Sequence, residues 1–75
     1  MHPAFEAELA TINGELVQIT RLVGSAMNRA TQALLDADLT LAETVIAADA
    51  QIDTLASDIE ERCFHLIAAS TPAED

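Results

Sequence analysis

The sequence predicts an all-α fold, an antiparallel hairpin of two long helices. The composition is 51% hydrophobic but only 3% aromatic, with 2 Gly and 2 Pro, which suits packed helices and gives little support for a sheet. Apolar residues recur at the alternating four- and three-residue spacing of a heptad. One short acidic segment, 36–39, divides this pattern in two. We therefore expect a single domain over residues 1–75, with helices at about 3–35 and 40–69.

The first predicted helix begins at about Pro3, because the amide hydrogen that proline lacks has no partner in a first helical turn. Its apolar seam consists of Phe5, Leu9, Ile12, Leu16, Ile19, Val23, Ala26, Ala30 and Ala33. The seam is widened by Leu22, Met27 and Leu34. We expect Phe5 and Met27 to belong to the core. Gly14 and Gly24 each cost about 1 kcal/mol relative to alanine inside a helix, and Gly24 is a candidate for close helix packing.

The connection Asp36-Ala37-Asp38-Leu39 is short enough to make the two helices antiparallel neighbours. Asp38 is a good N-cap for the second helix, and Thr40 is the alternative because Thr40-Leu41-Ala42-Glu43 has the pattern of a capping box. The second seam consists of Val45, Ala48, Ile52, Leu55, Ile59 and Leu66, with Cys63 beside it. Thr71 and Pro72 are expected to end the helix.

Two helices cannot cover apolar stripes of this width on each other alone. A chain of 75 residues also buries little core without help from a partner, a metal or disulfides. We therefore expect self-association of the hairpin into a four-helix bundle, or a three-helix bundle completed by a helix of another chain.

The charge of the chain limits its partners. With 13 acids against 3 bases, the formal net charge is -10, so binding to nucleic acid or to an anionic membrane surface is not expected. Cations and basic protein surfaces are the natural partners. A single cysteine allows no intrachain disulfide. Because the sequence shows neither a secretory signal nor a membrane-spanning run, the predicted location is the cytoplasm.

Asp49 and Asp53 are the candidate metal ligands. Their spacing of four residues places both carboxylates on one helix face, where hard oxygen ligands can share a cation. Glu60, seven residues beyond Asp53, continues the face as a further candidate. The alternative is that these acids form an ordinary solvated helix face.

The remaining polar residues suggest structural roles. Cys63 and His65 point to different sides of a helix, so Cys63 is expected at the edge of the core, and Glu61 is expected to pair with His65 at the favourable spacing of four. Arg21 and Arg29 are expected to pair with acids. No nucleophile–base constellation and no nucleotide motif occurs in the sequence, so an enzyme is not expected. The pattern Glu-x-x-His of di-iron bundles is also missing.

The order of residues resembles the PhoU family of phosphate-signalling proteins over nearly the whole chain. The resemblance begins with Phe5 and the first apolar seam, includes Leu22-Val23 and Ala30-Thr31-Gln32-Ala33-Leu34-Leu35, and continues through Asp38 to Glu61. Members are built from two tandem three-helix bundles, and the chain resembles the first two helices of the first repeat. The family's acidic E(D)xxxD motif corresponds to Asp49-Ala50-Gln51-Ile52-Asp53, which implies binding of iron or zinc by Asp49 and Asp53. The third helix and its second acidic motif are not matched, so a cluster would need ligands from another chain.

The resemblance implies a non-enzymatic interaction module. Family members repress phosphate-starvation signalling by linking a phosphate ABC transporter to a sensor histidine kinase, and these are the partners that it implies here, beside a second copy of the chain. The alternative is a purely structural, self-associating hairpin or a truncated piece without activity of its own.

Overall fold

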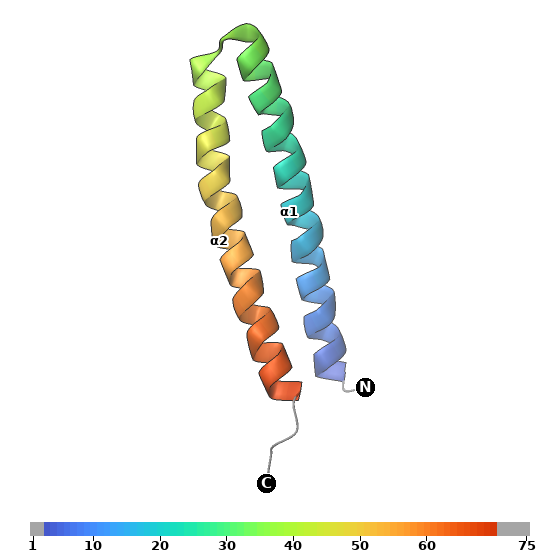
Figure 1. Cartoon of the computed structure of the whole chain (residues 1–75). Helices are drawn as coiled ribbons and strands as arrows, with labels where there is room; N and C mark the ends of the chain where they lie inside the picture. The colour runs from blue at the N-terminus through green and yellow to red at the C-terminus, as the bar shows by residue number, and fades with distance from the viewer. Residues whose placement is uncertain (1–2, 71–75) are drawn as a thin grey trace.

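The computed structural model describes residues 3–70, and these form two helices, α1 (Pro3–Asp36) and α2 (Leu39–Ser70). The helices lie side by side and run in opposite directions, so the start of α1 and the end of α2 lie at the same end of the hairpin (Figure 1). The prediction of an all-α antiparallel hairpin is confirmed. The predicted helix stop at Thr71 and Pro72 lies outside the described residues.

The core of the hairpin is one narrow seam between α1 and α2. Among residues 3–70, the buried side chains are Ile12, Ala33, Ala48 and Ile59. Half-buried residues continue the same seam along both helices, among them Ile19, Leu22, Ala26, Val45, Ile52 and Leu55. The seam consists mostly of small side chains near the turn, as the alanines of the sequence predicted. No side chain of the described part is fully buried, because each helix has only one neighbour.

α2 packs against one flank of the α1 seam, whereas the sequence predicted contact with the other flank. The half-buried residues beside the central row are Glu15, Leu22 and Arg29. The predicted partners, Leu9, Leu16 and Val23, are exposed. Met27 and Leu34 are exposed as well, at 65% and 84%, so the expectation that Met27 belongs to the core is wrong for the hairpin. The uncovered flank is apolar, whereas the covered flank places Leu22 between the charged residues Glu15 and Arg29.

Two polar contacts lie on the covered flank. Nε of Arg62 lies 3.1 Å from Oε1 of Glu15, whose side chain is only 17% exposed. This oxygen is buried and accepts no hydrogen bond within the described residues, so the attraction is ionic. Nη1 of Arg29 donates a hydrogen bond to Oγ1 of Thr44 at 3.0 Å and another to the carbonyl oxygen of Thr44 at 3.3 Å. Arg29 therefore crosses the hairpin as expected but contacts a threonine in place of an acid, and Arg21 forms no ion pair with any residue from 3 to 70.

The turn satisfies the backbone groups that the helix ends leave open. The amide of Ala37 donates to the carbonyl of Leu34 at 3.5 Å, and the amide of Asp38 donates to that of Ala33 at 2.9 Å. This is the Schellman pattern that ends many helices. A carboxylate oxygen of Asp38 then accepts a hydrogen bond from the amide of Leu41 at 3.0 Å. Asp38, and not Thr40, is therefore the N-cap of α2.

Two further observations complete the fold. A Cβ atom added at Gly24 would meet no atom within 4 Å, so the expectation that Gly24 serves close helix packing is wrong.

Neither described helix has a stretch that is both long and apolar enough to span a bilayer.

We predict that Ala37→Gly stabilises the hairpin by about 1 kcal/mol. Ala37 has a φ of 50°, in the left-handed region that disfavours residues with a Cβ atom and is the normal place for glycine after a helix. The measurement is the free energy of unfolding in urea. As a control, Ala50→Gly in the exposed middle of α2 should destabilise by a similar amount. Equal losses at both positions would contradict the turn geometry.

Candidate functional site

The candidate site is the face of the hairpin on the flank that α1 and α2 leave uncovered. We call it the open face. From α1 it takes the exposed residues Leu9, Leu16, Val23, Met27 and Leu34. From α2 it takes Leu39, Ile46, Asp49, Asp53, Glu60 and Ile67. In an antiparallel pair, residues that come one heptad position after a seam residue lie on the same side of the hairpin in both helices. The two rows therefore border one shared surface.

The open face is hollowed at both ends. Near the turn, a hollow of about 470 Å³ is lined by apolar residues of both helices, including Ala30, Leu34, Leu39, Ala42 and Ile46. Near the chain ends, a second hollow of about 440 Å³ is lined by Phe5, Leu9, Ile12, Cys63, Leu66, Ile67 and Ser70. Both hollows are open to solvent and almost wholly apolar, so each offers a seat for apolar side chains.

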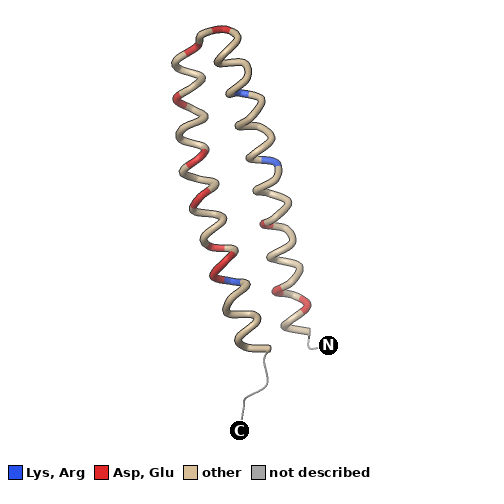
Figure 2. Tube along the Cα trace, in the orientation of Figure 1, with Lys and Arg blue, Asp and Glu red and all other residues tan. Residues whose placement is uncertain are grey.

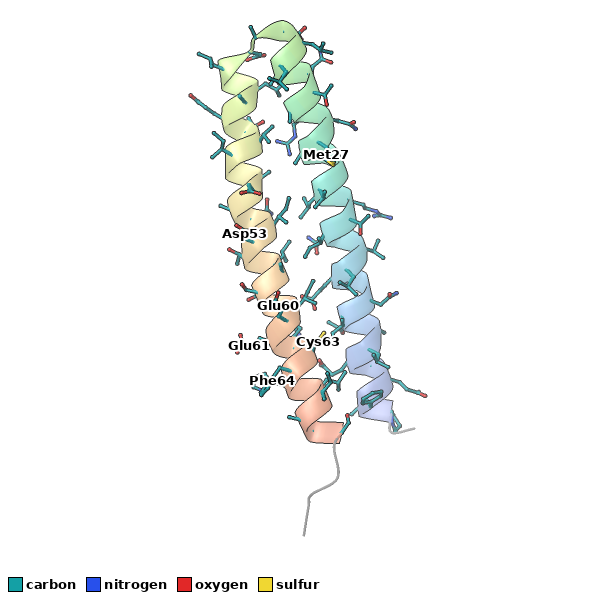
Figure 3. All side chains as sticks on the ribbon, in the orientation of Figure 1. Met27, Asp53, Glu60, Glu61, Cys63 and Phe64 are labelled. Atoms are coloured by element: carbon teal, nitrogen blue, oxygen red, sulfur yellow. The ribbon has the colours of Figure 1, made fainter. Side chains whose placement is uncertain are left out.

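Three carboxylates lie between these hollows. Asp53 and Glu60 occupy the same heptad row of α2 as Leu39, Ile46 and Ile67, since all are separated by multiples of seven residues. Asp49 lies beside this row, one turn before Asp53. The acids of the hairpin are concentrated on α2 (Figure 2), and the side chains of Asp53 and Glu60 can be followed in Figure 3. The α2 edge of the open face is thus apolar at its ends and acidic in its middle, and on α1 the polar residues Glu6, Asn13 and Thr20 share the heptad row of Met27 and Leu34.

The carboxylates differ in how well they could share a metal ion. Asp49 and Asp53 are about 6 Å apart along the helix axis, whereas Glu60 lies about 10 Å beyond Asp53. One ion cannot bridge that second gap at carboxylate–metal distances of about 2–2.5 Å. No group of three or more His, Cys, Asp or Glu residues that could hold an ion is found within residues 3–70. Asp49 and Asp53 therefore supply at most one edge of a metal site.

The other residues singled out in the sequence have structural surroundings. Cys63 is a half-buried free thiol at the edge of the seam, as predicted. Nε2 of His65 lies 3.6 Å from Oε1 of Glu61, which confirms the predicted pair of Glu61 and His65. The rings of His65 and Phe64 pack edge to face, with 5.7 Å between their centroids. Figure 3 shows Cys63 on the α1 side of α2 and Phe64 on its outer side.

Sequence reasoning missed the cross-helix pair of Glu15 and Arg62 and the two hollows. The pair had a signal, because Glu15 interrupts the apolar residues beside the seam and Arg62 is the single base of α2. The hollows had none, because their walls come from both helices and depend on how α2 is rotated against α1.

These features define an all-helical module, an incomplete bundle of two helices with one face exposed. The PhoU domain family matches residues 16–75, and the chain belongs to this family. Its members are non-enzymatic regulators of phosphate transport, in agreement with the sequence prediction that the chain is not an enzyme. The resemblance noted from the acidic segment of α2 is thereby confirmed.

Several curated relatives carry names from phosphate transport. The chain is 44% identical over 72 residues to the phosphate-specific transport system accessory protein PhoU homolog 2 of Mycobacterium tuberculosis, covering 96% of this chain and 34% of the relative. It is 43% identical over 72 residues to PhoU homolog 1 of Mycobacterium leprae (96% and 32%). It is 40% identical over 65 residues to the homolog of Aquifex aeolicus (87% and 29%). The chain thus spans about a third of the length of these relatives. No solved structure matches the chain.

We predict that replacing both acids of the α2 row, as Asp53→Leu with Glu60→Leu, strengthens self-association at least tenfold. The double substitution makes the row apolar over its whole length, and each leucine that becomes buried contributes about 1.5–3 kcal/mol. Sedimentation velocity over a range of concentrations measures the effect.

The matched control is Asp58→Leu with Glu61→Leu. These acids line a shallow depression with Arg62 and His65, away from the open face, and they carry the same charge. If both double variants associate alike, or neither associates more strongly than the unaltered chain, the acids of the open face do not limit self-association.

Proposed function

We propose that this chain acts as a helical interaction module in the regulation of phosphate uptake and phosphate-starvation signalling. The observation that carries the proposal is the family match over residues 16–75, supported by relatives named as accessory proteins of the phosphate-specific transport system. The open face supports a binding role, because apolar hollows of this kind on a small hairpin are suited to partner side chains. We further propose that the chain works in the cytoplasm.

The proposed partners are the phosphate ABC transporter or a sensor histidine kinase, which the family resemblance implies. The chain spans about a third of its relatives, so the proposal concerns the part of their work that two helices perform: docking through one face.

We predict that the chain lowers phosphate-starvation signalling in phosphate-rich medium. The assay expresses it in a bacterium that lacks its own PhoU homolog and carries a starvation-induced reporter enzyme. The expected result is a reduction of reporter activity of about threefold or more. The variant Ile59→Asp should abolish the effect, because it places a charge in the buried seam.

Circular dichroism of the purified chain establishes that it is helical. An unchanged reporter in cells that contain abundant, folded chain would contradict the regulatory role. That result would favour the alternative, a structural hairpin or a piece without activity of its own.

We also propose that Asp49 and Asp53 form one edge of a carboxylate site for iron or zinc, completed by ligands from outside the described residues. Their spacing on the exposed flank of α2 supports this, and a second copy of the chain is one source of the missing ligands. When bound, the ion would hold the open face and its partner together.

We predict that native mass spectrometry with added iron or zinc detects metal on a dimer or larger assembly, and that Asp49→Asn with Asp53→Asn removes at least 90% of it. Carboxamides lack the charge that such cations require. The control is Asp58→Asn with Glu61→Gln, which changes the net charge equally. A metal-free dimer would support self-association without the metal site, and equal metal content in both double variants would refute these ligands.

A further inference from the structure

Two polar contacts join α2 to the same flank of α1 at two separate points. In the half of the hairpin far from the turn, Nε of Arg62 lies 3.1 Å from Oε1 of Glu15. Nearer the turn, Nη1 of Arg29 donates a hydrogen bond to Oγ1 of Thr44 at 3.0 Å. Glu15 and Arg29 are two heptads apart, which is about 21 Å along α1. Two of the 3 bases of the chain serve these contacts, so the covered flank is fixed along much of its length.

Burial of apolar surface alone would place α2 on the other flank of α1. The row on the uncovered flank is apolar, and its Leu16 and Val23 are 49% and 37% exposed. The corresponding row on the covered flank is Glu15, Leu22 and Arg29. Because burial of apolar side chains is favourable, the observed packing omits contacts that a small movement of α2 around α1 would make. An interaction other than apolar contact therefore selects the covered flank.

The ion pair of Glu15 and Arg62 has the surroundings that such a selection needs. The side chain of Glu15 is only 17% exposed, and its buried Oε1 accepts no hydrogen bond from any residue between 3 and 70. Attraction between charges is stronger where water is partly excluded, because the effective dielectric constant is lower there. Movement of α2 to the uncovered flank would carry Arg62 away from Glu15 and lose this attraction.

The surface of α2 next to the open face would permit the other packing, with one exception. Ala42, Ala56 and Cys63 lie in one heptad row and are already half-buried, so these small side chains leave room for α2 to turn further inward. Asp49 belongs to the same row and is exposed. Its carboxylate would lose contact with water if the row turned inward, which is unfavourable. Asp49 therefore opposes the other packing.

We propose that the ion pair of Glu15 and Arg62 selects the rotation of α2 around α1 and thereby keeps the apolar flank of α1 uncovered. The hydrogen bonds of Arg29 hold the same rotation nearer the turn. Glu15 and Arg62 are positioning residues, because they act on the open face through the placement of α2. Without the pair, α2 moves over the row of Leu16 and Val23, and the hairpin closes its own open face. The selection concerns the geometry of the hairpin alone, so its failure would leave the proposed binding role in place.

The test is a charge reversal in the whole chain, read by methyl NMR with a soluble paramagnetic agent. The sample is kept at a concentration at which sedimentation velocity shows a monomer. In Glu15→Arg two arginines face each other on the covered flank, and their repulsion is relieved when α2 moves to the other flank. We expect the paramagnetic broadening of the Leu16 and Val23 methyl groups to fall by about threefold and that of Leu22 to rise by a similar factor.

The double variant Glu15→Arg with Arg62→Glu rebuilds the pair with its charges exchanged, and it should restore the broadening of the unaltered chain. The control Glu43→Arg makes the same change of charge at an exposed position of α2 and should leave the broadening unchanged. An unchanged pattern in Glu15→Arg would overturn the proposal, because the apolar seam alone would then set the rotation. Failure of the exchanged pair to restore the pattern would also overturn it, because the attraction between the two charges would not be the cause.

A second variant decides the question if Glu15→Arg loses its helices, which circular dichroism detects. Glu15→Ala with Asp49→Ala removes both the ion pair and the acid that opposes the other packing, and it introduces no repulsion. We expect the same exchange of broadening between Leu16 and Leu22. If Leu22 stays protected and Leu16 stays exposed in this variant, the pair stabilises the hairpin without selecting its packing, and the proposal is refuted. Loss of the helices in both variants would refute it as well, since no second packing would then exist.

Discussion

The structure depends on one constraint: each helix of the hairpin carries an apolar surface wider than a single neighbour can cover. The contact between α1 and α2 buries the central rows, with Ile12 and Ile59 at 6% exposure. It does not bury the next row on each helix, and Leu34, Leu39 and Ile46 stay largely exposed. A long hairpin with so narrow a seam has little free energy of folding from burial, and a partner on the open face would add to it.

The second constraint is electrostatic, because the α2 edge of the open face carries the acids Asp53 and Glu60. A continuous apolar row would attract any amphipathic helix, including that of another copy. Burial of the carboxylates of Asp53 and Glu60 without a counterion would oppose that outcome, because an unpaired buried charge is unfavourable. The α2 edge of the open face thus combines apolar residues, which favour association, with acids, which restrict the partners that fit.

Much of the fold follows from the sequence. The heptad spacing of the apolar residues predicts both helices, and the short segment with Asp38 predicts the turn and its cap. The left-handed φ of Ala37 was not predictable, since an alanine gives no signal for it. The rotation of α2 was not predictable either: Leu16 and Leu22 are equally suited to flank the seam of α1, and the choice depends on pairs such as Glu15 with Arg62, which are distant in sequence.

The candidate site could be predicted in part. The spacing of Asp49 and Asp53 placed them on one face of α2, and the family resemblance connected them with metal. Their position between two apolar hollows depends on where α1 lies, which no local pattern encodes. The rise of a helix likewise separates Glu60 from Asp53 by about 10 Å, so the third candidate ligand belongs to another row of the face.

The most direct test of the exposed face is the accessibility of its isoleucine methyl groups in the chain alone. Methyl NMR of a dilute sample with a soluble paramagnetic agent reports this accessibility for each residue. Strong broadening is expected for Ile46 and Ile67, which are 71% and 66% exposed, and little for Ile12 and Ile59. Protection of all four residues in the chain alone would contradict an exposed face, because the face would then already be covered.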